Sequence, residues 1–186
     1  MKIMIPDDSY PERYWLNYDH DKNLSHLEFS LAKKLEVVAS PMVFSIKGKV
    51  SLANLRKFDF LYSDGPDLVS ENVARILRNN CPNEVQFFSA RVKVNGEILT
   101  DYAVLNLLKS EEAFDLESCV YVPLIKSMPD GPRKFKNIAL QDKLSNAQIF
   151  RASEDRGSVI VSEKLAQIFT SATVKGVIFV SKLEGV

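Results

Sequence analysis

The sequence predicts an α+β fold with mixed or antiparallel sheets, a few helices and two related units, each made of a capped helix and a strand. The clearest sign is an internal repeat. Val69–Val92 and Val161–Glu184 align without a gap, 92 residues apart, and share Val, Ser, Glu, Ala, Ile, Val, Phe and Ser at matched positions. Apolar residues make up 46% of the chain, which is enough for a folded core.

Each copy of the repeat is predicted to be a helix followed by a strand. Ser70 and Ser162 suit the N-cap, because a serine hydroxyl accepts a hydrogen bond from a free amide of the first helical turn. An acidic residue follows each serine, as the positive end of a helix favours. Apolar residues then recur at helical spacing, at Val73, Ala74, Ile76 and Leu77 in the first copy and at Leu165, Ala166, Ile168 and Phe169 in the second. We therefore assign both serines to capping rather than to catalysis.

The remaining elements are expected to be short strands separated by polar turns. In chain order they are a strand near Tyr14–Tyr18 in an irregular segment, strands at Met42–Ile46 and Phe58–Tyr62, a hairpin of Arg91–Val94 and Leu99–Leu107, an alternating segment at Phe114–Glu117, a buried strand at Val120–Ile125 and a strand at Ile149–Ala152. The hairpin turn is Asn95-Gly96, the strongest short hairpin signal.

The length of 186 residues fits a single domain, 1–186, or two subdomains, 1–125 and 133–186, joined by a loop at 126–132. The apolar start of the chain ends at Pro6, short of the roughly 7–15 apolar residues of a secretion signal. No run approaches the roughly 20 apolar residues of a membrane span. The two cysteines are too few for a disulfide scaffold. We therefore expect a cytoplasmic protein with no membrane partner.

Charge is balanced overall but segmented along the chain. The 24 basic and 24 acidic residues cancel, which argues against a direct nucleic-acid partner. The difference between Lys+Arg and Asp+Glu is −3 for residues 1–30, +4 for 31–60, −5 for 61–120 and +4 for 121–186. Such segments suit recognition of a charged protein surface.

No motif indicates catalysis, a cofactor or a metal. The glycines are too dispersed for a phosphate-binding loop, the cysteines lack metal-ligand spacing, and no G-x-S-x-G is present. The two histidines are interpreted as solvated surface residues. Two acidic pairs, Asp19 with Asp21 and Asp115 with Glu117, would each share one face of a strand. Such pairs could serve acid–base chemistry or metal binding, could face a basic partner, or could be merely solvated.

Several short segments form an ordered set that begins in the N-terminal segment and continues toward the C-terminus. They are Tyr14–Asp19, Val69–Glu71 with Val85–Phe88, Tyr102–Asn106, Phe114–Ser118, and Ile149–Arg151 followed by Ile160–Leu165. In this order they resemble the eleventh immunity-protein family of bacterial polymorphic-toxin systems, although residues 20–60 do not match its pattern. The resemblance implies a small cytoplasmic protein that binds and neutralises a cognate toxin domain, and it carries over no catalytic residue.

The expected partner is therefore a toxin protein. The chain has no recognisable export signal, so a toxin that acts in the cytoplasm is favoured, as a nuclease or as an enzyme that modifies nucleotides or proteins. We predict that Tyr14, Trp15, Tyr18, Asp19 and Asp21 hold it, because aromatic side chains make strong interface anchors and acidic ones attract a basic surface. The alternative for these residues is that Trp15 is a core residue and the acids are solvated.

Two other functions remain open at this stage. One is a small cytoplasmic hydrolase with an unrecognised carboxylate site, for which Asp115 and Glu117 are the candidates. The other is a structural or regulatory subunit. A neighbouring gene for a large protein with a C-terminal toxin domain would favour the immunity function, and an operon of metabolic enzymes would favour the hydrolase.

Overall fold

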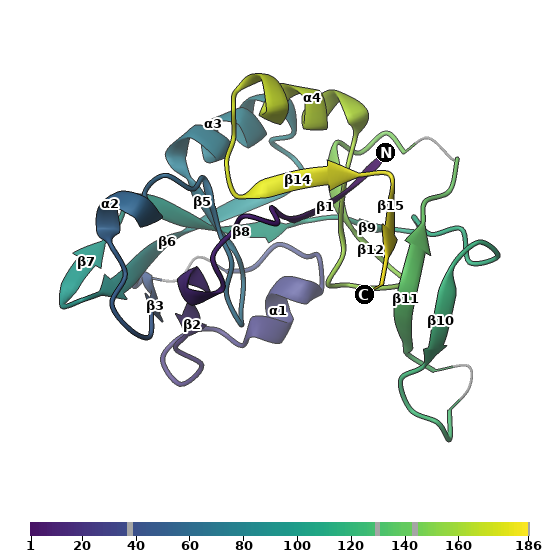
Figure 1. The fold of residues 1–186 in the computed structure, drawn as a ribbon, viewed down its shortest axis with the longest axis horizontal. Coiled ribbons are helices and arrows are strands. Elements are labelled where there is room, and N and C mark those ends of the chain that lie inside the picture. Colours follow the sequence, from purple (N-terminus) through teal and green to yellow (C-terminus); the bar gives the residue numbers. More distant parts are fainter. Residues whose placement is uncertain (37–38, 129–130, 143–144, 186) are drawn as a thin grey trace.

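The computed structural model describes residues 1–36, 39–128, 131–142 and 145–185. Over these ranges the chain forms an α+β fold with mixed and antiparallel sheets, as predicted (Figure 1). The helices are α1 His26–Ser30, α2 Leu52–Leu55, α3 Glu71–Asn80 and α4 Glu163–Ser171, with a 3-10 turn, η1, at Glu12–Tyr14. Pro129 and Asp130, in the predicted loop 126–132, lie outside the described residues.

The described strands form three sheets that combine distant parts of the chain. In spatial order, the first holds β14 Val177–Val180, β1 Lys2–Pro6, β13 Val159–Val161, β12 Ile149–Ala152 and β9 Ser110–Glu111. The second holds β2 Asn17–Tyr18, β3 Met42–Ser45, β6 Val85–Val94, β8 Tyr102–Leu107, β5 Leu68–Ser70 and β4 Phe60–Leu61, and β7 Glu97–Leu99 also pairs with β6. The third holds β10 Val120–Pro123, β11 Arg133–Ala139 and β15 Lys182–Glu184.

The predicted repeat is present, and each copy begins with a strand that the sequence does not indicate. A strand precedes each helix, so the copies run β5–α3–β6 and β13–α4–β14. In each copy a further strand lies between the two and is antiparallel to both, β8 in the first copy and β1 in the second. The outer strands of each copy are therefore parallel to one another, and both copies are split β-α-β units.

The two helices of the repeat pack against each other on one side of the sheets (Figure 1). Their predicted apolar faces point into the protein. The buried residues are Val73, Ala74, Ile76 and Leu77 in α3 and Leu165, Ala166 and Phe169 in α4, with Ile168 half-buried. The matched aromatic residues that follow, Phe87 and Phe179, are also half-buried alike. The repeat therefore describes packing as well as sequence.

The serines at the matched N-caps make matched contacts. The Oγ of Ser70 accepts a hydrogen bond from the Val73 amide at 3.4 Å, and that of Ser162 accepts one from the Leu165 amide at 3.0 Å. Each hydroxyl also donates, to Asp59 Oδ1 at 2.6 Å in the first copy and to a glutamine side chain at 2.7 Å in the second. The predicted capping role is confirmed.

The first sheet separates two hydrophobic cores. Along β12, Ile149 belongs to the larger core and Phe150 to the smaller one, and along β13, Val161 and Ile160 divide in the same way. Successive residues of a strand point to opposite faces, so each strand alternates between the cores. This explains why β13 is continuously apolar, and why β12 is apolar apart from Arg151.

The buried side chain of Glu84 joins the first half of the chain to the first sheet. Its Oε2 accepts the backbone amides of Gln148 and Ile149 at 2.8 and 2.9 Å, and its Oε1 accepts the Lys109 ammonium at 3.0 Å. Buried amides need acceptors, and a carboxylate provides a strong one. Glu84 therefore fixes the position at which β12 begins.

The expectation of a buried strand at Val120–Ile125 is wrong in its burial. The strand β10 forms, but all four of its residues are exposed. It is an edge strand of the third sheet and pairs only with β11 over the described residues, in a hairpin that projects from the body (Figure 1). An apolar strand is buried only when another layer covers it, and the sequence does not show whether such a layer exists.

Three other expected strands are corrected in detail. At Phe114–Glu117 only Phe114 makes a strand bridge, to Leu140, because the Asp115 carboxylate caps a turn that follows it. The expected strand Leu99–Leu107 is divided into β7 and β8, which pair with different parts of β6. The expected strand near Tyr14–Tyr18 is η1 followed by the two residues of β2.

Replacing either capping serine by alanine is expected to destabilise the protein. We expect Ser70→Ala and Ser162→Ala each to lower the free energy of unfolding by about 0.5–2 kcal/mol, since each loses the bond to a free helical amide. Ser51→Ala is the matched control, because Ser51 precedes α2 without making a side-chain capping bond. Urea unfolding measures all three. Equal stability of the three variants would contradict the assignment.

Replacing Glu84 by glutamine should also destabilise the protein. Glutamine is nearly the same size, but its uncharged oxygen is a weaker acceptor for the two amides, and the ion pair with Lys109 is lost. The expected loss is about 1.5–3 kcal/mol of unfolding free energy, the range for hydrogen bonds to charged groups. Glu97→Gln, at an exposed position of β7, serves as the control. A Glu84→Gln variant as stable as this control would disprove the role of the carboxylate.

Candidate functional site

The five residues predicted to hold a partner do not form one surface. The side chains of Tyr14 and Tyr18 are only 3% and 4% exposed and belong to the larger core. The Tyr18 hydroxyl is engaged, since it donates to the Leu24 carbonyl at 2.7 Å. These two tyrosines are therefore core residues, and the third aromatic residue of the set, Trp15, is 44% exposed.

The two acidic residues of the set differ in what they contact. The Asp19 carboxylate binds the Lys22 ammonium at 3.0 Å, and this hydrogen bond lowers the pKa of Asp19. The Asp19 backbone carbonyl accepts the amides of Lys22 and Asn23, so the residue organises its own turn. Asp21 is exposed. Of the two, Asp21 is the one whose side chain faces solvent without a described ion pair.

Trp15 is exposed but firmly held. Its ring lies 5.6 Å from the ring of Tyr62 at an interplanar angle of 32°. Its backbone amide donates to the Glu12 carbonyl at 3.1 Å, at the end of η1. The Tyr62 hydroxyl in turn donates to the Gly176 carbonyl at 2.9 Å, which anchors the ring beneath Trp15. The indole is therefore positioned before any partner arrives.

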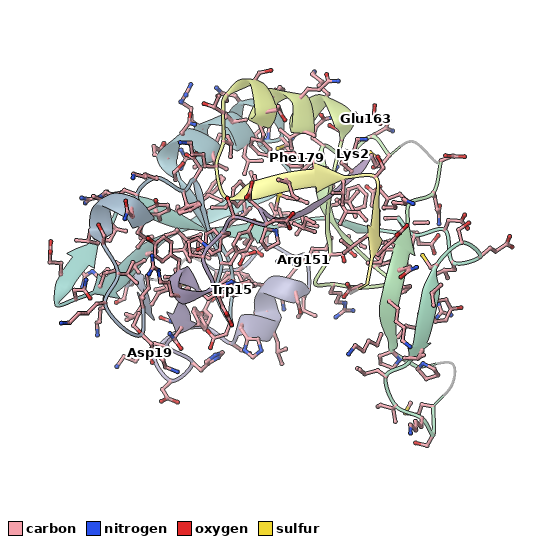
Figure 2. The ribbon with its side chains drawn as sticks, in the orientation of Figure 1. Lys2, Trp15, Asp19, Arg151, Glu163 and Phe179 are labelled. Carbon is pink, nitrogen blue, oxygen red and sulfur yellow. The ribbon has the colours of Figure 1, made fainter. Side chains whose placement is uncertain are left out.

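Trp15 and Tyr62 line a cleft of about 380 Å³. The other walls come from the end of β1, from α1, from the loop before β5 and from the turn between β12 and β13. Figure 2 shows Trp15 and Arg151 beside α1, whereas Asp19 lies apart from them. The polar groups in the cleft include Asp67, Arg151 and His26. A cleft with an aromatic wall and a few convergent polar groups has the usual composition of a binding site.

Arg151 is held in the cleft by backbone carbonyls. Its Nε donates to the Phe29 carbonyl of α1 at 3.0 Å, and its Nη1 donates to the Arg156 carbonyl at 2.9 Å. Burial lowers the pKa of Arg151, while Asp67 and Asp155 act in the opposite direction. No carboxylate oxygen lies within 4.0 Å of the Arg151 guanidinium among the described residues.

Asp67 is an acid of the cleft whose pKa is well above its ordinary value. Burial raises its pKa to about 6, although Arg151 and the Ser63 amide, at 3.4 Å, both lower it. Buried acids with raised pKa values beside a specific charge gather at functional sites, and they also occur in purely structural networks. Here the acid, the guanidinium and an exposed indole share one cleft, which makes this the best candidate site of the molecule.

The carboxylates of the alternative hydrolase are arranged differently. Asp115 Oδ2 accepts the Ser118 hydroxyl at 2.6 Å, and Oδ1 accepts the Glu117 amide at 3.2 Å. The first of these hydrogen bonds is the main cause of the lowered pKa of Asp115. Within the ranges that the structure covers, no group of three or more His, Cys, Asp or Glu side chains is placed to hold a metal. No helix in the same ranges has the length and apolar content to cross a bilayer.

The sequence could not indicate the cleft as a whole. Asp67 follows a predicted loop, and Arg151 lies in a predicted strand, but nothing in either pattern places them together. Of the residues that line the cleft, Trp15 is the one that the sequence predicts to bind a partner. No known family matches the chain when it is compared with family models, and a comparison with functionally curated proteins gives no match. The resemblance to the immunity family therefore rests on the segments given above.

The raised pKa of Asp67 predicts a pH-dependent effect on stability. The folded protein holds the Asp67 proton more tightly than the unfolded chain does, whose carboxyl has the ordinary pKa of 3.8. This stabilising contribution is complete below about pH 4 and is lost as the pH rises through about 6. Between pH 4 and pH 7, the melting temperature of Asp67→Asn should therefore rise relative to that of the wild type.

The control for this experiment is Asp21→Asn, which replaces an exposed acid outside the cleft. Its melting temperature should follow the wild type across the range, since other carboxylates affect both proteins equally. A difference between Asp67→Asn and the wild type that does not change with pH would show that Asp67 ionises normally in the folded protein.

Proposed function

We propose that this protein is a cytoplasmic immunity protein that binds and neutralises a cognate toxin domain, and that the toxin docks at the Trp15 cleft. The observation that carries the proposal is the exposed, preoriented indole of Trp15 at the edge of a polar cleft. The ordered resemblance to the immunity family supports the same class of function.

The physical basis is the cost of ordering an interface. Trp, Tyr and Arg dominate binding energy because they bury large areas and add directional hydrogen bonds. A side chain already fixed by its neighbours loses little entropy on binding, so more of the contact energy is retained. Trp15 meets this condition through the contact of its ring with the tilted ring of Tyr62, and Arg151 meets it through its two backbone contacts.

The acidic N-terminal segment favours a toxin with a basic surface. Residues 1–30, which provide Trp15 and α1, have a net charge of −3, and Asp21 is an exposed acid within them. Toxins that act on nucleic acid carry basic surfaces, and complementary charge speeds their encounter with an acidic partner. The cleft itself is lined by one acid, Asp67, and by two arginines, Arg151 and Arg156, so it suits a polar toxin side chain that donates to Asp67 and accepts from Arg151.

The first test is protection in living cells: the neighbouring genes are searched for a large protein with a C-terminal toxin domain, and this domain is produced together with the protein. Co-expression should restore the growth of cells that this domain poisons. Trp15→Ala should weaken the purified complex by at least about 2 kcal/mol, roughly thirtyfold, as a hot-spot residue does. Ile98→Ala is the control, because Ile98 is equally apolar and exposed but lies on β7. Isothermal titration calorimetry measures both affinities.

Two outcomes would contradict the proposal. Growth that is not restored, with both proteins produced, would reject the immunity function. Restored growth with equal affinities for Trp15→Ala and Ile98→Ala would keep the function and move the interface elsewhere. Asp21→Lys separates the electrostatic part, since it should slow association at low salt and the difference should close as salt rises.

A further inference from the structure

The hairpin of β10 and β11 is the most exposed apolar part of the described structure. Figure 1 shows it projecting from the body, with the end of β10 and the start of β11 farthest from the body. At this end Leu124, Ile125 and Met128 are 62%, 45% and 52% exposed. Monomeric proteins seldom display several large aliphatic side chains together without a use for them. We call this end, residues 124–128, the tip.

Aromatic contacts join the hairpin to the body at its base. The ring of Phe135, in β11, lies 4.9 Å from that of Phe114 and 5.4 Å from that of Tyr121. The Arg133 guanidinium lies 4.6 Å from the centre of the Tyr121 ring. The tip has its own hydrogen bonds, from the Leu124 amide to the Pro132 carbonyl at 2.7 Å and from the Met128 amide to the Ile125 carbonyl at 2.9 Å. The aliphatic side chains are therefore presented on a firm support.

Basic residues lie along the hairpin. Residues 120–138 contain four basic side chains, Lys126, Arg133, Lys134 and Lys136, and one acidic residue, Asp130. Lys126, Lys134 and Lys136 are exposed. We call Lys126, Arg133 and Lys134, which lie in or next to the tip, the basic collar. Two features bring proteins to anionic bilayers, insertion of apolar side chains and attraction to acidic headgroups, and the tip and its collar provide both.

The composition of the tip favours a bilayer over a protein surface. Anchors in protein interfaces are mainly Trp, Tyr and Arg, and leucine is under-represented among them. The tip instead presents aliphatic chains, which hydrocarbon accepts without requiring a shaped pocket.

We propose that the hairpin docks on an anionic lipid bilayer, with the aliphatic tip in the headgroup region and the basic collar on acidic headgroups. This proposal differs from the expectation, drawn from the sequence, that the protein has no membrane partner. It is independent of toxin binding, because the hairpin and the Trp15 cleft share no residue. The body of the protein stays in water, with the cleft open to a partner.

Vesicle sedimentation tests the proposal with the purified full chain. The wild type should bind phosphatidylcholine vesicles that contain about one third phosphatidylglycerol, and should bind far less to phosphatidylcholine alone. Leu124→Ser with Ile125→Ser should reduce partitioning about tenfold or more, since it removes two inserted side chains. Lys126→Glu with Lys134→Glu should do the same, and added salt should weaken wild-type binding.

The matched control is Leu27→Ser with Leu31→Ser, which removes two equally exposed aliphatic side chains from the region of α1. It should bind vesicles as the wild type does, and all variants should keep their melting temperature because the altered side chains are exposed. No binding of the wild type to anionic vesicles would overturn the proposal. Unchanged vesicle binding by Leu124→Ser with Ile125→Ser would also overturn it. Retention on immobilised polyglutamate without vesicle binding would assign the hairpin to an acidic protein instead.

Discussion

The two cores depend on the register of β12, and the Glu84 carboxylate fixes that register. Its contacts with the first amides of β12 place Ile149 toward the larger core and Phe150 toward the smaller one. A shift by one residue would exchange these faces along the whole strand. The first sheet is covered on both sides, so neither face tolerates such an exchange. One buried acid therefore coordinates two hydrophobic layers.

Asp59 joins the two split units in a comparable way. Its carboxylate accepts the Ser70 hydroxyl on one side and the Lys175 amide on the other, and its backbone bonds to the same two residues. The cap of α3 and the turn before β14 are therefore positioned by a single residue. The sequence contains two copies of the repeat, and in the structure their helices pack together over adjoining sheets.

Local chemistry made part of this fold predictable. The serine caps and the helix faces follow from spacing alone, and Asn95 and Gly96 adopt the positive φ values, 51° and 86°, that their hairpin turn requires. Features that depend on distant neighbours were not accessible. These include the burial of β1, whose pattern is too short to distinguish from a loop, the exposure of β10, and the meeting of Asp67 with Arg151. Of the candidate site, the sequence indicated only Trp15. The same reasoning also selected Tyr14 and Tyr18, which are buried, because the sequence does not show which aromatic residues reach the surface.

The position of β1 has a consequence for synthesis on the ribosome. Its residues are made long before those of its partners, because both neighbouring strands lie between residues 159 and 180. At about 5–20 residues per second, roughly ten to thirty seconds pass before those partners exist. The second split unit cannot close during this interval, and an apolar strand stays available to chaperones or to another nascent chain. Folding of this half is therefore a late event, whereas the first unit, whose strands are all encoded between residues 68 and 107, can form while translation continues.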